Sequence, residues 1–401
     1  MSRKIELLAP AGNLERLKIA CKYGADAVYI GGTNYSMRAN AKNFSNSDIK
    51  EACLFAHNLG KKVYVTVNIV FHNEDYKGLV NYLKELESFG VDAIIISDMA
   101  IIDIVHDNNI KLPLHISTQM SNSNYESVMY LKNEGVERVV LARECSRDNI
   151  KEIINKTGVE IECFLHGAMC SSISGRCVLS NYFTGRDANR GGCAQICRWC
   201  FDIANDEEEI NNDTKFTMSC KDLSLIKNLK EMIEIGITSL KVEGRMRSNY
   251  YIATVISTYR EAIDNYYSGT LTDKKIEYYS KILNRVANRE STSQFFDKFP
   301  GVEEQYFLGR QEVSNQDFLG IVLDYNDEEH IVTLEQRNYF KKGDKVEFFG
   351  PNIETFSFQI EDIYDEENNL IDIARHPREI VKFKLNTRVS KDDIMRTKID
   401  Y

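Results

Sequence analysis

The sequence predicts an α/β fold: a (β/α)8 TIM-like barrel with a Cys-rich insertion, followed by a helical segment and a small C-terminal β-barrel domain. Three observations support this prediction. Short β-branched runs alternate with amphipathic stretches over the first 245 residues, seven of the ten cysteines lie between Cys163 and Cys220, and short alternating runs replace this pattern after Gly320. We place the barrel and its Cys-rich site at residues 1–248, the helical segment at 249–305 and the β-barrel domain at 306–401.

The composition is that of a folded protein with more than one domain. The chain has 401 residues, 43% of them hydrophobic and 27% charged, with only five prolines, a balance that supports a packed core and argues against disorder. No long apolar stretch precedes Pro10, so the start of the chain does not resemble a secretory signal. No window approaches the roughly 20 apolar residues that span a bilayer. We therefore expect a cytoplasmic protein with no membrane partner, whose thiols stay reduced.

Eight β-branched runs are the candidate barrel strands. They are Ile5–Ala9, Ala27–Ile30, Lys62–Val67, Ala93–Ile96, Pro113–Ile116, Arg138–Leu141, Glu160–Phe164 and Ser239–Val242. Between them, stretches such as 13–23, 46–59 and 76–89 place apolar residues three and four positions apart, as amphipathic helices do. Eight strands favour a closed barrel over a six-strand open sheet, and no G-x-G-x-x-G motif follows the first strand to indicate a dinucleotide site.

The interval between Phe164 and Ser239 is too long for one barrel helix, so we expect an insertion after the seventh strand. Loops that follow barrel strands lie on the C-terminal face, where active sites of this fold are built. Beyond the barrel, helices are predicted at 250–267 and 274–287. Five further runs predict antiparallel strands: Gly320–Leu323, His330–Leu334, Lys345–Phe349, Phe356–Ile363 and Ile380–Phe383. This small β domain either presents a surface to a partner or only stabilises the chain.

The clustered cysteines indicate a metal or redox centre in the insertion. From Cys170 their spacing is C-x6-C-x15-C-x3-C, ending at Cys197. Irregular spacing on Gly- and Arg-rich loops suits an iron–sulfur cluster, whereas the single C-x2-C pair, Cys197 and Cys200, leaves a zinc site open. A thiol nucleophile beside His166 is a third interpretation, and a structural role for His166 is equally consistent with its place near the end of a strand. No G-x-S-x-G or H-E-x-x-H motif indicates another hydrolytic site.

The net charge of −10 argues against non-specific attraction to a phosphate backbone. A nucleic-acid substrate would therefore need a local basic surface. Two stretches of basic residues would provide such a surface. The alternative is that their side chains are solvated and bind no partner. The two stretches are Arg176, Arg186, Arg190 and Arg198 among the cysteines, and Lys241, Arg245 and Arg247 after the last predicted barrel strand.

Two segments around the first clustered cysteines resemble the signature of the collagenase-like peptidase family U32. They are Glu162–Cys170, with the sequence ECFLHGAMC, and Ser174–Ser180, with the sequence SGRCVLS. Supporting stretches extend the resemblance over most of the chain: Glu6–Asn13, Gly24–Tyr29, Arg186–Gly191, Ser219–Leu223 and Leu240–Met246. The resemblance implies one of two activities, because some members are credited with collagenase-like proteolysis and others are similar to oxygen-independent hydroxylation proteins.

The hydroxylating members imply a specific cofactor, substrate and partner. They carry a four-iron four-sulfur cluster, and the most similar subgroup helps to convert the wobble uridine of tRNA to 5-hydroxyuridine and is thought to use prephenate. The resemblance assigns the cluster ligands to Cys170, Cys177, Cys193 and Cys197, with Cys200 and Cys220 as alternatives for the fourth position. It places Cys163 at a variable position of the signature, within the packing.

Under the hydroxylation hypothesis, arginines and acid–base groups near strand ends are the other candidate site residues. Arg143 and Arg245 would clamp a dicarboxylate such as prephenate, Arg176 would add a further substrate contact, and Glu243 and His166 are the candidate catalytic groups. A structural ion pair is the alternative for Arg143, Arg245 and Glu243.

Aromatic side chains beside the basic loop are candidates for contact with RNA. Tyr182, Phe183 and Trp199 would stack on unpaired bases of the anticodon region, or else belong to the core. Two alternatives to hydroxylation remain open: a U32-type peptidase, and a non-catalytic partner of a second family member.

Overall fold

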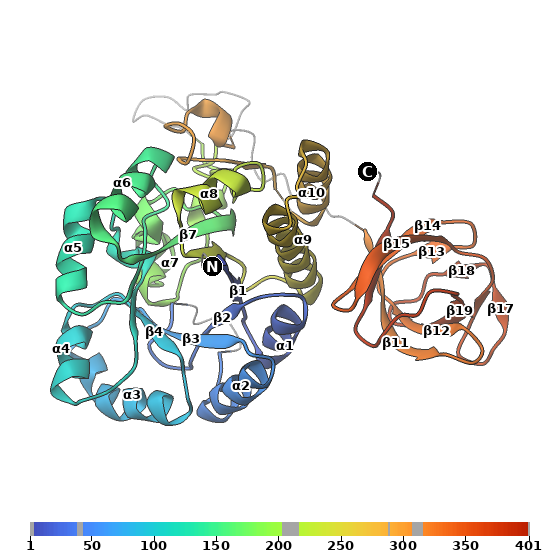
Figure 1. The fold of residues 1–401 in the computed structure, drawn as a ribbon, viewed down its shortest axis with the longest axis horizontal. Helices are drawn as coiled ribbons and strands as arrows, with labels where there is room; N and C mark the ends of the chain where they lie inside the picture. The colour runs from blue at the N-terminus through green and yellow to red at the C-terminus, as the bar shows by residue number, and fades with distance from the viewer. Residues whose placement is uncertain (1–3, 38–42, 203–215, 288, 307–315, 400–401) are drawn as a thin grey trace. The chain divides into compact units, whose positions relative to one another are not determined.

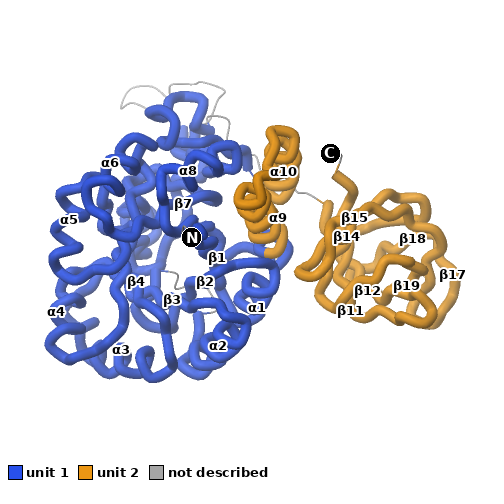
Figure 2. The backbone as a smooth tube through the Cα atoms, in the orientation of Figure 1, with its two compact units in different colours: residues 1–252, 289–311 blue, residues 253–288, 312–401 orange. Residues whose placement is uncertain are grey.

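The computed structural model describes residues 4–37, 43–202, 216–287, 289–306 and 316–399. The chain forms two compact units, one of residues 1–252 and 289–311 and the other of residues 253–288 and 312–401 (Figure 2). Residues 289–306 therefore belong with the barrel and not with the helices that precede them.

Within the described residues, eight parallel strands close the first unit into a barrel (Figure 1). They are β1 Glu6–Pro10, β2 Ala27–Gly31, β3 Lys62–Val67, β4 Ala93–Ile96, β5 Leu114–Ile116, β6 Arg138–Val140, β7 Glu160–Gly167 and β9 Ser239–Val242. Each pairs with the next, and β9 closes the ring by pairing with both β7 and β1. All eight predicted strands are confirmed, and the largest difference is that β7 continues to Gly167.

Helices follow the strands and pack their apolar faces on the outside of the barrel. They are α1 Leu14–Lys22, α2 Asn46–Asn58, α3 Leu79–Ser88, α4 Ala100–Asp107, α5 Tyr125–Asn133, α6 Arg147–Thr157 and α8 Leu229–Ile235, with 3-10 turns η1 Asn73–Tyr76 and η2 Thr118–Met120. Side chains of Asn13, Ser45, Asn124 and Ser146 each accept a hydrogen bond from a backbone N–H of the first turn. These caps satisfy amides that have no partner inside the helix and define where each helix begins.

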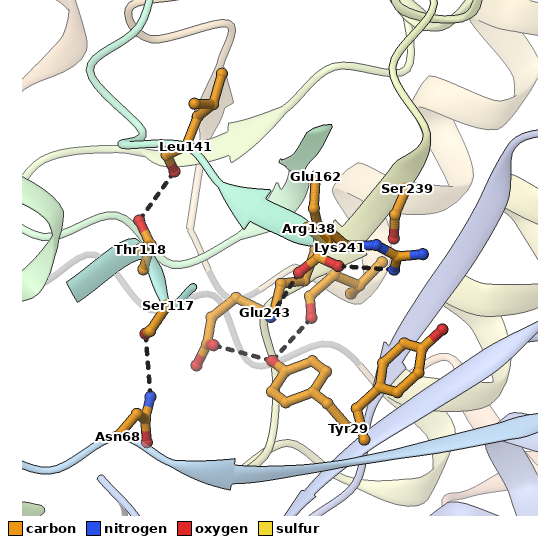
Figure 3. Close-up of polar contacts among 12 residues, drawn as sticks. Tyr29, Asn68, Ser117, Thr118, Arg138, Leu141, Glu162, Ser239, Lys241 and Glu243 are labelled. Carbon is orange, nitrogen blue, oxygen red and sulfur yellow. Dashed lines mark hydrogen bonds and ion pairs between the residues drawn. The ribbon is translucent and has the colours of Figure 1, made fainter. Parts of the chain in front are cut away.

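The barrel interior combines apolar side chains with a buried network of charges. Arg138 of β6 donates to Glu160 and Glu162 of β7 at 2.8 and 3.3 Å, and also to Glu6 of β1. Lys241 of β9 donates to Glu162 at 2.7 Å (Figure 3). Burial of these charges is tolerable because each one is paired inside the barrel.

The predicted insertion lies between β7 and β9 and is built from short elements. They are η3 Ile173–Gly175, α7 Leu179–Thr184, η4 Ala188–Arg190, η5 Ile196–Arg198 and β8 Asp222–Ser224. Strand β8 runs antiparallel to the end of β7, and β10 (Ser291–Thr292) pairs with β8 from the far side. The turn η6 (Val302–Glu304) follows β10 in the same unit.

The second unit contains α10 (Asp273–Val286), most of α9 (Asn249–Tyr267) and an antiparallel β domain. Its strands are β11 Phe318–Asn326, β12 Ile331–Gln336, β13 Phe340–Lys341, β14 Lys345–Gly350, β15 Ile353–Gln359, β16 Ile363–Tyr364, β17 Leu370–Ile371, β18 Ile373–Ala374, β19 Ile380–Lys384 and β20 Ile394–Thr397. Over residues 316–399, eight of them form one sheet in the order β15-β14-β20-β11-β12-β19-β16-β17, which curves around its own apolar core (Figure 1). The predicted antiparallel domain is confirmed.

The prediction of one strand over Phe356–Ile363 is wrong at its second half. Strand β15 ends at Gln359, after which the Ile360 N–H donates to the Asp344 carbonyl and the chain turns before β16 begins at Ile363. In neither unit do the described residues include a helix with the length and apolarity needed to cross a bilayer.

Candidate functional site

The Cys-rich insertion is fastened over the C-terminal ends of the barrel strands. The Glu144 carboxylate, after β6, accepts hydrogen bonds from the Ser174 N–H and hydroxyl, each at 2.7 Å. Arg190 donates to Asp75 (Nη2–Oδ1 2.9 Å) and to the Val70 carbonyl (2.7 Å), both of which follow β3. The insertion is thus anchored at two places on the face where barrel enzymes carry their active sites.

The clustered cysteines differ in exposure and in their fixed contacts. Cys170, Cys193 and Cys200 are exposed, Cys177 and Cys197 are half-buried, and Cys220 is buried. An amide clamp holds the backbone of Cys177, because Asn189 accepts from its N–H at 3.1 Å and donates to its carbonyl at 3.0 Å. The Cys177 sulfur accepts the Leu179 N–H at 3.4 Å, the kind of contact that tunes metal-bound thiolates.

Four of these thiols lie close enough to influence one another. Burial raises the pKa of the Cys197 thiol, Arg198 opposes the rise, and Cys170 and Cys193 add to it. Burial raises the pKa of Cys220 to about 12, with further contributions from Cys170 and Cys197. Cys170 and Cys193 therefore lie near Cys197, and Cys170 and Cys197 lie near Cys220.

The donor types around these cysteines are compatible with an iron–sulfur cluster. Among the described residues, no three His, Cys, Asp or Glu side chains converge as ligands of one ion, and tetrahedral zinc needs its sulfurs at about 2.3 Å from one centre. An iron–sulfur cluster takes each thiolate at a different iron, so its ligands need not meet at one centre. Thiolates are soft donors, and an N–H directed at sulfur and a neighbouring arginine are contacts that tune such a group when it is bound.

The two predicted catalytic groups lie side by side at the ends of β7 and β9. The Glu243 N–H donates to the His166 carbonyl at 2.8 Å, and the Glu243 carboxylate accepts from the Tyr29 hydroxyl at 3.3 Å (Figure 3). A Cβ at Gly167 would lie 2.5 Å from the Glu243 carbonyl oxygen, so only glycine allows this approach. Burial, aided by Arg247, lowers the pKa of His166 to about 3, which makes the imidazole neutral at physiological pH.

The predicted substrate-binding arginines contact different parts of the barrel mouth. Arg143 lies 3.7 Å above the Phe164 ring and donates to the Ala168 carbonyl at 2.6 Å. Arg245 is buried and donates to Ser36 at 2.8 Å and Asn43 at 3.0 Å, both between β2 and α2. Arg176 is exposed on the insertion.

The three aromatic candidates are exposed and do not belong to the core. Tyr182 is 84% exposed, Phe183 54% and Trp199 45%. The rings of Phe183 and Trp199 meet edge to face with centroids 6.4 Å apart. We call Tyr182, Phe183 and Trp199 the aromatic surface. It lies on the same insertion as the cysteines and the exposed Arg176 and Arg186.

Comparison with known proteins agrees with this architecture. The family model described as "Peptidase family U32" matches residues 12–306, and "Peptidase family U32 C-terminal domain" matches residues 314–396. The chain belongs to peptidase family U32. It is 49% identical over 402 residues to tRNA hydroxylation protein P1 of Bacillus subtilis (strain 168), covering 99% of this chain and 95% of that protein.

Two further relatives of this U32 protein carry different names. The chain is 38% identical over 263 residues to the 23S rRNA 5-hydroxycytidine C2501 synthase of Escherichia coli (strain K12), covering 66% of this chain and 40% of that protein. It is 35% identical over 320 residues to a collagenase of Porphyromonas gingivalis (strain ATCC BAA-308 / W83), covering 76% of this chain and 74% of that protein. The family therefore includes relatives named for RNA hydroxylation and for proteolysis.

Sequence reasoning missed an ionic group beside the cysteines of this U32 protein. Asp222 of β8 is buried and pairs with Arg289 (Nη2–Oδ1 2.8 Å) and Arg247 (Nη2–Oδ2 3.4 Å). Burial raises the pKa of the Asp222 carboxyl, while Arg289, Arg247, Arg198 and Arg143 act against the rise. The sequence did not identify Arg289 as a site residue, because Arg289 follows helices α9 and α10 and is distant in sequence from the barrel strands. The pairing of β10 with β8 brings it to the barrel.

Proposed function

We propose that this U32 protein hydroxylates RNA, and that its substrate is the wobble uridine of tRNA, converted to 5-hydroxyuridine. The observation that carries the proposal is a thiol-rich insertion anchored over the mouth of a barrel, with exposed aromatic rings beside it. Similarity over nearly the full length to a tRNA hydroxylation protein, and over two thirds of the chain to an rRNA hydroxycytidine synthase, supports this activity.

The cysteines would hold a four-iron four-sulfur cluster. Cys170, Cys177, Cys193 and Cys197 are the proposed ligands, and Cys220 is the alternative to Cys197 because its thiol lies beside those of Cys170 and Cys197. When bound, such a group supplies redox chemistry whose potential depends on nearby charges and on hydrogen bonds to sulfur. The chain provides both through Arg198 and through the Leu179 N–H.

The insertion and the barrel mouth would each bind a different part of the RNA. Bases of a single-stranded anticodon loop stack on exposed aromatic rings, and arginines contact the phosphates; here the aromatic surface, Arg176 and Arg186 would do so. The target uracil would leave the stack and enter the barrel mouth. There, Asn68 donates to Ser117 at 3.2 Å and Tyr29 donates to Glu243 (Figure 3).

The neutral imidazole of His166 and the side chain of Glu243 suit different tasks. With a pKa of about 3, His166 stays neutral and serves as a hydrogen-bonding group, not as an acid. Glu243, whose carboxylate accepts from the Tyr29 hydroxyl in Figure 3, is the better candidate to accept the proton that leaves C5 of the uracil. Replacement of the C5 hydrogen by a hydroxyl removes two electrons from the uracil, so a co-substrate would have to supply the oxygen atom and accept these electrons; prephenate, a dicarboxylate, is the candidate.

Nucleoside analysis of tRNA from a deletion strain tests this proposal. We expect 5-hydroxyuridine and its derivatives to disappear from the mass spectrum, and to return with the wild-type gene but not with Cys170→Ala. An unchanged nucleoside profile in the deletion strain would contradict the proposal.

Proteolysis is the second candidate, because of the similarity to a collagenase over 76% of the chain. A cysteine or serine peptidase needs a histidine base with a pKa near the working pH. Burial of His166 works against that role. Cleavage of peptides by a variant with Ala at Cys170, Cys177, Cys193 and Cys197 would favour proteolysis. Activity that appears only after addition of a second family member would instead make this chain a non-catalytic partner.

A further inference from the structure

We propose that Asn68, held in one orientation by Ser117, selects uracil as the target base by accepting a hydrogen bond from its N3–H. We call these two residues the amide pair. The inference deepens the proposed function and rests on it, since it names the group that distinguishes uracil from cytosine at the barrel mouth.

The amide pair lies where the barrel strands end. Asn68 follows β3 and Ser117 follows β5, while Glu243, the proposed proton acceptor, follows β9. The carboxyl ends of parallel barrel strands meet on one face, and Figure 3 shows the Glu243 carboxylate between the Tyr29 hydroxyl and the amide pair. In uracil, N3 and C5 lie on either side of C4, so groups on these neighbouring edges can contact one base together.

Hydrogen bonds restrain Asn68 at its backbone and at its side chain. Its backbone N–H donates to the Tyr35 carbonyl at 2.8 Å, and its Nδ2 donates to the Ser117 hydroxyl at 3.2 Å. Ser117 is buried, and its hydroxyl oxygen also accepts the Gln119 N–H at 3.3 Å. Because two N–H groups converge on this oxygen, the amide nitrogen of Asn68 faces Ser117 and its Oδ1 faces away.

The amide oxygen that faces away is left without a hydrogen bond. Within the described part of the chain, Oδ1 of Asn68 is a buried acceptor with no partner, although the residue as a whole is only half-buried. An unpaired buried acceptor is costly, so a ligand N–H that reaches it stabilises the complex. The amide pair is therefore prepared for a donor that the protein itself does not supply.

The imide edge of uracil matches this amide, and the corresponding edge of cytosine does not. Uracil presents an N–H donor at N3 beside the O4 acceptor, so Asn68 Oδ1 can accept from N3 while the second hydrogen of Nδ2 is donated to O4. Cytosine has a lone pair at N3, which would face the lone pairs of Oδ1, and an amino group in place of O4. A site built around a hydrogen bond rejects a base that cannot make it, because the polar group of the site then stays unpaired.

Gln119 connects the amide pair to the Cys-rich insertion. A Cβ at Gly175 would lie 3.1 Å from Gln119 Nε2 and 3.8 Å from the Cys170 sulfur, so these two side chains approach the same turn. The loop after β5 thus carries both the residue that orients Asn68 and a side chain beside the first proposed cluster ligand. A base held by the amide pair would lie on the side of the barrel mouth where this loop meets the cysteines.

Binding of anticodon stem–loop RNAs to the full-length protein, measured by fluorescence anisotropy, tests the amide pair. Three probes carry uracil, 3-methyluracil or cytosine at the wobble position and are otherwise identical. We expect the wild type to bind the uracil probe at least about tenfold more tightly than either of the others, because only uracil donates a hydrogen bond from N3.

Three variants separate base selection from a general loss of RNA binding. Asn68→Ala should bind all three probes with similar affinity. Ser117→Ala should still bind RNA but should lose several-fold of the preference for uracil over cytosine, because an unrestrained amide can rotate to match either base. Asn58→Ala, at the exposed end of α2, is the matched control and should keep the full preference. Thermal unfolding of each variant verifies that it is folded.

The probes alone can overturn the inference without any variant. Equal affinity of the wild type for the uracil and 3-methyluracil probes would do so, and a preference for cytosine would mean that Asn68 presents its amino group instead. A full preference for uracil in Asn68→Ala would assign base selection to another residue.

Failure of the amide pair and failure of the proposed function give different results. Equal affinities for the three probes, together with loss of 5-hydroxyuridine in the deletion strain, would refute the amide pair alone. A preference for uracil that depends on Asn68, together with an unchanged nucleoside profile in the deletion strain, would refute the proposed hydroxylation alone.

Discussion

Glu144 holds Ser174 by two hydrogen bonds of 2.7 Å, one from the backbone N–H and one from the hydroxyl. Ser174 lies between Cys170 and Cys177 and adopts a left-handed conformation (φ 48°, ψ 28°) that is unfavourable for a residue other than glycine. The carboxylate of a barrel loop therefore stabilises the turn that separates two proposed cluster ligands.

Replacement of this carboxylate should weaken the cluster without removal of a thiol. We expect Glu144→Ala to purify under anaerobic conditions with several-fold less iron and sulfide than the wild type, because the turn loses both restraints. Ser174→Gly is the matched control: it loses the hydroxyl contact but keeps the N–H contact and removes the backbone strain, so it should retain more iron than Glu144→Ala. Equal iron in Glu144→Ala and the wild type would contradict this role.

Single Ala substitutions of the cysteines should show, by their effect on bound iron, which cysteines are cluster ligands. Cys170→Ala, Cys177→Ala and Cys193→Ala are expected to lose most of the bound iron, measured with sulfide after anaerobic purification. Comparison of Cys197→Ala with Cys220→Ala identifies the fourth ligand, which we expect to be Cys197. Cys53→Ala, in the buried face of α2, is the control and should keep its iron. Full iron content in Cys170→Ala would reject the ligand assignment.

The charge network inside the barrel should contribute strongly to stability. Arg138→Met leaves Glu6 and Glu162 without their guanidinium partner, and loss of one partner from a buried ion pair costs about 3–5 kcal/mol. Urea denaturation should show this decrease in the free energy of unfolding. The control Lys18→Gln removes an exposed ion pair with Glu51 and should cost less than about 1 kcal/mol. Equal costs would mean that the interior network does not depend on Arg138.

His166 should make the protein less stable as the pH falls. Its pKa is about 3 in the folded state and 6.5 as a free side chain, so between these values the unfolded state binds a proton that the folded state does not. Its contribution to stability is complete above pH 6.5 and decreases toward pH 3, by at most about 1.4 kcal/mol per pH unit. In chemical denaturation, His166→Asn should flatten the pH dependence between pH 6.5 and pH 4. An unchanged slope would show that His166 is accessible to protons in the folded protein.

The aromatic surface should contribute to RNA binding and not to folding. Tyr182→Ala is expected to weaken binding of an anticodon stem–loop by about 1–3 kcal/mol and to leave thermal stability nearly unchanged, because Tyr182 is 84% exposed. Tyr130→Ala, with 57% exposure on α5, is the control for loss of an exposed tyrosine. Trp199 is the single tryptophan of the chain, so quenching of intrinsic fluorescence reports its contact with RNA directly. Equal affinities of the two Tyr variants would place the RNA elsewhere.

The barrel could be predicted because each element has its own pattern along the chain. Lys62–Val67 and Ser239–Val242 were predicted to the residue, since β-branched runs and glycine turns are local signals. The end of strand β15 in the terminal β domain was not predicted correctly, because the chain there turns toward a hydrogen bond with Asp344, which lies outside the strand itself.

The candidate site was predictable only where its residues are close in sequence. The spacing of Cys170, Cys177 and Cys193 is a property of the amino-acid sequence, whereas the environment of His166 depends on the packing of Arg247 and Tyr251 against it. The resemblance of the signature segments to family U32 agrees with the family models, which match both units.

The amino-acid sequence by itself determined the order of strands and helices, the concentration of thiols in one insertion and the family, because periodicity, spacing and motifs are properties of neighbouring residues. Only the tertiary structure decided that Arg289 meets Asp222, and that Arg247 joins them while Arg245 turns to Ser36. The physical reason is that barrel closure and the pairing of β10 with β8 bring together charged side chains that are distant in sequence.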